Sequence, residues 1–195
     1  GKVVVVNPIK EPGLVRFKVP SDWKSMLLGD DIIATDYVQP NIGGDIALFQ
    51  GIGKELIENE NIDKQFIGKY TNGFKNFAHE LRKTSWDNIT LSSGVNRTQI
   101  KRLAKLYQDA KNVVFTWSMG ITQHIHGVEN VESIVNLALL RGMIGKKNAG
   151  LLPLRGHSNV QGIGSMGVTP ELKKKILINF EKQMGIKVPK STGLD

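Results

Sequence analysis

Two glycine-rich segments carry most of the side chains that could bind or position a ligand. Residues 117–127 read WSMGITQHIHG, and residues 154–164 read LRGHSNVQGIG. Glycine lets backbone N–H groups approach a ligand closely, while amide, imidazole and guanidinium side chains donate hydrogen bonds to it. We therefore expect the two segments to form two halves of one ligand site.

Arg155 is the strongest candidate for binding an anion. Its guanidinium is a permanent, forked donor that suits a carboxylate, a phosphate or an oxo group. An arginine can also pair with a structural carboxylate, but residues 133–170 contain no Asp or Glu. The lack of an acidic residue nearby in the sequence favours a ligand.

The histidines are compatible with either binding or structural roles. His157 follows Gly156 in a segment dense in polar groups, which suits a ligand contact. His124 and His126 are two positions apart, so their side chains share a side only in an extended chain, and the spacing does not match the helical pairing of a zinc-binding HExxH motif. Each could contact a ligand or be a structural histidine.

Both segments must be positioned by the elements before them. The four valines of residues 3–6 end at Asn7-Pro8, which predicts a strand buried on both faces with a turn at its carboxyl end. Residues 31–38 predict a second strand, and the loop after it leads through Gly43-Gly44 into a helix that Asp45 is expected to cap and that runs to about Asn59. Residues 111–117 predict a third strand, which ends where the first glycine-rich segment begins.

The repeated order of strand, glycine turn and helix predicts an α/β fold: a doubly wound, mainly parallel sheet with helices on both faces and ligands at its carboxyl edge. At that edge Asn7 could read a ribose or a base, or simply form an Asx-turn. The Gly43-Gly44 loop is a usable phosphate or hydroxyl site. Gly120 alone is not a GxGxxG fingerprint, so a standard NAD site is poorly supported.

Other segments are interpreted as packing elements without a chemical role. Helices are predicted at residues 63–67, 73–83 and 128–142, and in the segment after Asn96, whose spacing to Gln99 is that of a capping box. Residues 86–91 are predicted to be a linker.

Composition narrows the function classes. The 195 residues include no cysteine, so disulfides, cysteine-ligated clusters and a thiolate nucleophile are excluded within this chain. The net charge is +8, but the one basic triplet, residues 173–175, has no interleaved aromatics, so a solvated basic face is favoured over a nucleic-acid groove, while a smaller phosphate-bearing ligand stays open. No apolar run is long enough to span a membrane and no signal peptide is evident, which predicts a cytoplasmic protein.

A longer chain of motifs resembles a known superfamily. The motifs are WSMGITQHIHGVENV at 117–131, NLALLRGMIG at 136–145, NAG at 148–150, PLRGHSNVQG at 153–162 and MGVTP at 166–170. Together they resemble the molybdopterin oxidoreductase superfamily, most closely its formate-dehydrogenase-like alpha-subunit branch. The similarity is dense over residues 112–170 and weaker over residues 1–110.

This resemblance implies that residues 1–170 are an internal domain that binds a molybdenum bis(molybdopterin guanine dinucleotide), and that residues 171–195 are a helical or irregular extension leading to the next domain. The negative charge of the cofactor's pyrophosphate suits the net positive charge of the chain. The positions matching the pterin and phosphate contacts are Met119, Gly120, Thr122 and Gln123, and Gly156 is a further cofactor-binding position beside Arg155. The positions nearer the guanosine end are Asn7, Gly43 and Asp45.

The resemblance also implies a catalytic role for two residues. Arg155 matches the arginine that lies near molybdenum and orients the substrate, with His157 beside it. Ser118 stands where relatives commonly have glycine, and His157-Ser158 replace a Gln-Asn pair, which leaves the substrate open. The residue that ligates molybdenum, and any iron–sulfur cluster, would lie upstream of residue 1.

The whole enzyme is then expected to carry out a two-electron oxidation of formate or a similar small anion, together with its remaining domains and an electron-transfer partner and without nucleic acid. The alternatives are an oxo-transfer reductase of the nitrate or sulfoxide type and a non-catalytic nucleotide- or pterin-binding module. As a separate piece, these 195 residues are expected to show no turnover.

Overall fold

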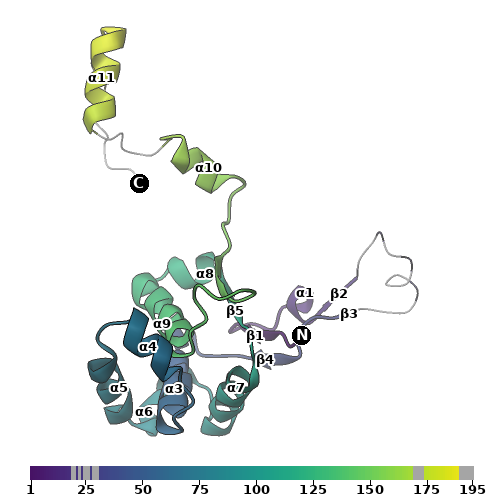
Figure 1. The fold of residues 1–195 in the computed structure, drawn as a ribbon. Helices are drawn as coiled ribbons and strands as arrows, with labels where there is room; N and C mark the ends of the chain where they lie inside the picture. Colours follow the sequence, from purple (N-terminus) through teal and green to yellow (C-terminus); the bar gives the residue numbers. More distant parts are fainter. Residues whose placement is uncertain (19–20, 22, 24–26, 28–30, 169–173, 189–195) are drawn as a thin grey trace. The chain divides into compact units, whose positions relative to one another are not determined.

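The computed structural model describes residues 1–18, 21, 23, 27, 31–168 and 174–188 (Figure 1). They belong to two units, Gly1–Leu152 and Pro153–Asp195. All buried residues among those described lie in the first unit. The predicted boundary at residue 170 and the first residue of the basic triplet lie outside the described residues, so the division at residue 170 stays a prediction.

Helix α3 (Asp45–Glu58) carries much of the core of the first unit. It packs against α5 (Phe74–Lys83), α6 (Trp86–Ser93), α7 (Arg97–Asp109) and α9 (Gly127–Leu140). Its side chains Leu48, Leu56 and Ile57 are almost completely buried, and each contributes about 1.5–3 kcal/mol through the hydrophobic effect. The predicted helix over residues 45–59 is confirmed.

Gly44, and not Asp45, is the N-cap of α3. A Cβ on Gly44 would lie 2.8 Å from the backbone oxygen of Ser92 and 2.9 Å from the Cα of Ser93, so no side chain fits there. Asp45 is instead the first residue of the helix, where a carboxylate is favoured by the helix dipole. The prediction that Asp45 caps the helix is therefore wrong, because close packing against α6 reserves the cap position for glycine.

The strands are short and pair in twos. Strand β1 (Val4–Val6) is parallel to β4 (Asp36–Val38), with Val4 opposite Asp36 and Val6 opposite Val38. Strand β2 (Arg16–Phe17) is antiparallel to β3 (Asp31–Ile32), and β5 (Val114–Trp117) pairs with β6 (Gly150–Pro153). The α/β class is confirmed, whereas the doubly wound sheet stays a prediction.

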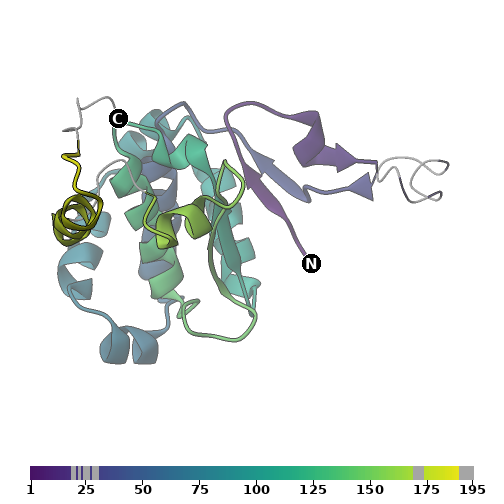
Figure 2. The same ribbon diagram turned by 90° about the horizontal axis from the view of Figure 1, so that it is seen from above.

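Strand β1 is only partly buried. In Figures 1 and 2 the core helices α3, α5, α6, α7 and α9 lie to one side of the β1–β4 pair, and the short helix that follows β1 lies on the other side. Val6 packs against the core, but Val3 and Val4 are 42% and 39% exposed. The prediction that this strand is buried on both faces is therefore wrong for the described residues.

Side-chain caps mark the beginnings of three helices of the first unit. The helices not yet described are α1 (Pro12–Val15), α4 (Lys64–Tyr70) and α8 (Met119–Thr122). Asp63, Ser85 and Asn96 each accept a hydrogen bond from the backbone N–H three residues later, at the starts of α4, α6 and α7. The predicted cap at Asn96 is confirmed, and the prediction of a linker over residues 86–91 is wrong because Ser85 starts a helix that buries Ile89.

The second unit contains α10 (Val160–Ser165) and α11 (Lys174–Met184). None of its described residues is buried, and Ile178 and Met184 of α11 are among its exposed apolar side chains. Across the described part of the chain, no helix combines the length and the apolar character that crossing a bilayer requires.

Candidate ligand-binding site

The segments that follow β1 and β4 lie side by side. The backbone N–H of Asn7 donates to the carbonyl of Val38 at 3.0 Å, and the side-chain amide of Gln39 donates to the carbonyl of Pro8 at 3.0 Å. Because parallel strands end at the same edge, Asn7 is next to the start of the loop over residues 39–45. Three segments were predicted to lie at the carboxyl edge of the sheet. Two of them, those that follow β1 and β4, are therefore neighbours.

The loop over residues 39–45 is held by the carboxyl end of α6. The backbone N–H of Asn41 donates to the carbonyl of Ser93 at 2.7 Å, and the Asn41 side-chain amide faces the carbonyls of Leu91 and Ser92 at 3.3 and 3.4 Å. Gly94 ends α6 with φ of +70°, and a Cβ there would lie 2.4 Å from the Asn41 side-chain oxygen. The loop is thus clamped before any ligand binds.

His124 joins this loop to the segment that follows β5. Its Nε2 lies 3.3 Å from the position that a Cβ on Gly43 would occupy, and Gly43 has the left-handed φ of +79°. Its Nδ1 accepts a hydrogen bond from the backbone N–H of His126 at 3.1 Å, which leaves Nε2 as the nitrogen that faces Gly43. His124 therefore has a structural function as the contact between two candidate ligand loops.

The electrostatics of the same junction involve Asp45. Burial raises the pKa of the half-buried Asp45 carboxyl above its ordinary value, because removal from water disfavours the charged form. A backbone hydrogen bond at Asp45 and the electrostatic effect of the nearby His124 ring lower the pKa of this carboxyl and partly offset the effect of burial. The Asp45 carboxyl is thus partly removed from water beside the contact of Gly43 with His124.

The segment after β5 forms the short helix α8. Gln123 closes it by donating its backbone N–H to the carbonyl of Met119 at 2.7 Å. Gly120, Thr122 and Gln123 are exposed, and Met119 is half-buried. A Cβ on Gly120 would have no neighbour within 4 Å, so this glycine faces open space that a ligand could occupy.

The apolar residues beside this junction are exposed. Ile42, next to Gly43, is 86% exposed, and Ile125, next to His124, is 89% exposed. Single exposed apolar side chains are common, but here two of them border the contact between the loops. Their position suits a surface that a ligand or another part of a longer protein covers.

The structure places Gly43, Asp45 and His124 of the segment after β5 at one junction, and Asn7 lies beside the start of the loop that carries Gly43. Arg155, Gly156 and His157 belong to the second unit, in the exposed segment between β6 and α10. Their participation in one site with the α8 segment stays a prediction.

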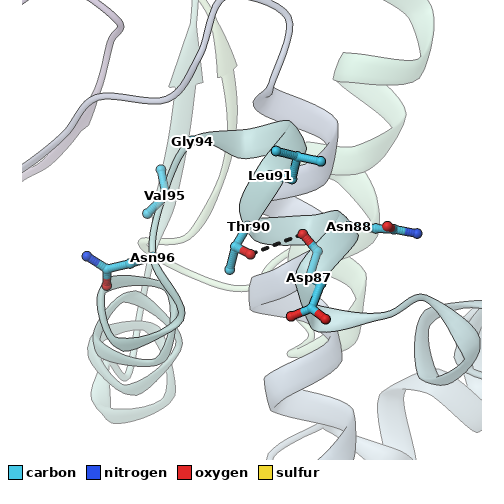
Figure 3. A pocket seen from close by; sticks show the side chains of 7 residues that line it. All are labelled: Asp87, Asn88, Thr90, Leu91, Gly94, Val95 and Asn96. Carbon is cyan, nitrogen blue, oxygen red and sulfur yellow. Dashed lines mark hydrogen bonds between the residues drawn. The ribbon is translucent and has the colours of Figure 1, made fainter.

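Two hollows in the described part of the first unit are lined by other residues. Figure 3 shows the first, of about 490 Å³, at the junction of α6 and α7, where Thr90 donates its hydroxyl to the carbonyl of Asp87 at 3.1 Å. The second, of about 580 Å³, is lined mainly by polar residues that include Asp63 and Arg141. Neither contains a predicted site residue. Within the described ranges, no group of three or more His, Asp or Glu side chains could hold a metal ion.

Comparison with known proteins identifies the superfamily. No family model matches the chain. An uncharacterised oxidoreductase of Mycobacterium tuberculosis is 36% identical over 200 residues, which cover 100% of this chain and 26% of the relative. The protein YdeP of Escherichia coli is 37% identical over 203 residues, covering 98% and 27%. Formate dehydrogenase H of Escherichia coli is 36% identical over 139 residues, covering 71% and 19%.

A solved structure shares the fold of this chain. Acetylene hydratase from Pelobacter acetylenicus matches with a TM-score of 0.61 over 75% of this chain and 18% of the hydratase, and at 16% identity the match shows the fold alone. The chain belongs to the molybdopterin oxidoreductase superfamily, as the motifs predicted. It spans about a quarter of the length of the curated relatives that it matches over almost all of its residues.

Proposed function

We propose that this chain is the cofactor-binding part of a molybdenum-dependent oxidoreductase, and that the full-length enzyme oxidises formate or a similar small anion by two electrons. The main support is the contact of Gly43 with His124, which joins the Gly43 loop to the segment after β5. The resemblance to the superfamily is what assigns cofactor contacts to these two segments. The identity of 36% with formate dehydrogenase H over 139 residues supports the substrate class.

The residues of the first unit suit a molybdopterin guanine dinucleotide. Gly43 and Asp45 would hold the guanosine end, with Asn7 beside them, and the α8 segment would hold the pterin and phosphates. Gly120 leaves open space for close approach, and the net charge of +8 favours a pyrophosphate. When bound, the cofactor supplies the two-electron redox chemistry. This part of the proposal includes the doubly wound sheet, for which the parallel β1–β4 pair is the local support.

Arg155 is proposed to hold the substrate anion by a charge-assisted hydrogen-bonded pair, with Gly156 and His157 beside it. A guanidinium offers a planar fork of N–H donors, so Arg155 is proposed to orient the anion and not to transfer a proton. The proposal also includes a cytoplasmic location, the remaining domains, an electron-transfer partner, and a metal ligand and any iron–sulfur cluster outside these 195 residues.

The proposed function is tested by assaying the full-length enzyme with formate and an artificial electron acceptor, while its pterin and molybdenum contents are measured. We expect formate-dependent reduction of the acceptor by the molybdenum-loaded enzyme and no turnover by the 195-residue chain alone. Activity with nitrate or a sulfoxide instead of formate would support the oxo-transfer reductase, for which the His157-Ser158 pair is the specific reason. A pterin-containing enzyme without any of these activities would support a binding module.

Gly120→Ala is expected to separate ligand contact from folding. The added Cβ meets no protein atom within 4 Å, so the unfolding temperature of the enzyme without cofactor should stay the same or rise slightly. In the enzyme with cofactor, the same methyl group would occupy space proposed for the ligand, so the pterin content should fall. Unchanged pterin content, measured by fluorescence of the oxidised pterin, would remove Gly120 from the proposed contact surface.

A further inference from the structure

Asn130 is a buried polar residue beside the proposed cofactor-binding turn. It lies in the first turn of α9, and its side chain is 1% exposed. Its Nδ2 donates to the carbonyl of Ile121 at 3.1 Å. Its Oδ1 has no hydrogen-bond partner among the described residues.

The hydrogen bond to Ile121 fixes the orientation of the Asn130 side chain. Only the amide nitrogen can donate to the carbonyl of Ile121, so the orientation of the side-chain amide is fixed and Oδ1 must point elsewhere. A buried acceptor without a partner is unfavourable for folding, and an apolar side chain of similar size would avoid that cost. The stability of the fold alone therefore does not explain why position 130 is an asparagine. The hydrogen bond from its side chain to the α8 segment explains it.

A second contact fixes the same segment. A Cβ on Gly127 would lie 2.3 Å from the backbone oxygen of Thr122, so the start of α9 lies directly against the end of α8. The backbone N–H of Gly127 also donates to the carbonyl of His124 at 2.9 Å. The C-terminal end of α8 is thus held at two adjacent residues. The side-chain amide of Asn130 donates to the carbonyl of Ile121, and Gly127 packs against the carbonyl of Thr122.

We propose that Asn130 is a positioning residue for the cofactor-binding turn, residues 119–123. It contacts no ligand itself, because its side chain is buried, and it acts through the carbonyl of Ile121 to hold the turn in its binding conformation. This inference rests on the proposed function, which assigns the turn to the pterin and phosphates. It adds a residue outside the loops to the determinants of cofactor retention.

The test compares Asn130→Leu with wild type and with Glu132→Gln, an exposed position on the same helix, in the full-length enzyme. Pterin content after gel filtration, the unfolding temperature without cofactor, and hydrogen exchange of the backbone are measured for each. For Asn130→Leu we expect about tenfold weaker retention of pterin, an unfolding temperature close to wild type, and faster exchange confined to residues 119–123. Glu132→Gln should match wild type in all three measurements.

Three results would overturn the proposal. Wild-type pterin retention by Asn130→Leu would show that the hydrogen bond to Ile121 is not needed. Faster exchange that extends to α3, together with a lower unfolding temperature, would assign Asn130 to general stability of the fold. If the wild-type enzyme contains no pterin, the proposed function itself is wrong. This result differs from the first two, in which the wild-type enzyme does contain pterin.

Discussion

Arg155→Ala in the full-length enzyme is expected to lower kcat/KM for formate by about 10²- to 10³-fold, the loss typical of removing one preorganised donor from a catalytic site. The pterin and molybdenum contents should stay at wild-type levels, because Arg155 is proposed to contact the substrate and not the guanosine or the pyrophosphate. Steady-state kinetics with formate and an artificial acceptor, normalised to molybdenum, measure the effect.

Two further variants sharpen the experiment on Arg155. Arg155→Lys keeps the positive charge but lacks the planar fork, so its loss should be smaller than that of alanine but clearly measurable. Arg16→Ala removes an exposed arginine of β2 and should leave the kinetics unchanged. A loss of pterin that parallels the loss of activity in Arg155→Ala would assign this residue to cofactor binding instead of substrate orientation.

Gly127→Ala is expected to destabilise the folded enzyme by about 1–3 kcal/mol. The added methyl group would be placed 2.3 Å from the carbonyl oxygen of Thr122 and 3.0 Å from its carbonyl carbon. Since both are backbone atoms, relief requires α8 to move away from α9, which also moves the proposed cofactor-binding turn. Pterin content should therefore fall together with the unfolding temperature.

Gly120→Ala is the matched control for this prediction. Both variants add one methyl group within the same short stretch of chain, but only the one at Gly127 collides with the backbone. Chemical denaturation of the two variants without cofactor measures the difference. Equal stability of Gly127→Ala and wild type would mean that α8 can shift at no cost, and would weaken the view that this turn is held rigidly.

Helices with strong local patterns could be predicted from the sequence. The apolar repeat that includes Leu48 and Leu56 predicted α3, and both residues are almost completely buried in it. Asn96 was recognised from its spacing to Gln99, because a cap is a contact between near neighbours. Helix α6 was missed since its apolar repeat is weak, although Ser85 three residues before Asn88 is a signal that could have found it.

Contacts between distant segments could not be predicted in this way. The amide of Asn41 binds carbonyls at the end of α6, and Gly94 is required there because of the same side chain. Lys54 is buried and donates to the carbonyls of Leu81 and Arg82 at 3.1 and 2.7 Å, although helical spacing alone would place a lysine at the surface. Such partners have no fixed spacing in the sequence, so only the folded chain reveals them.

The contact between Gly43 and His124 has a consequence for the order in which the domain folds and binds its proposed cofactor. The two residues are far apart in the chain, so their contact closes a long loop, and such contacts form slowly because the entropy of loop closure must be lost first. Helices such as α3 and α7 can form from local contacts before this happens. We therefore expect the cofactor to bind a domain that has already folded, and its later binding to increase the stability of that domain by mass action.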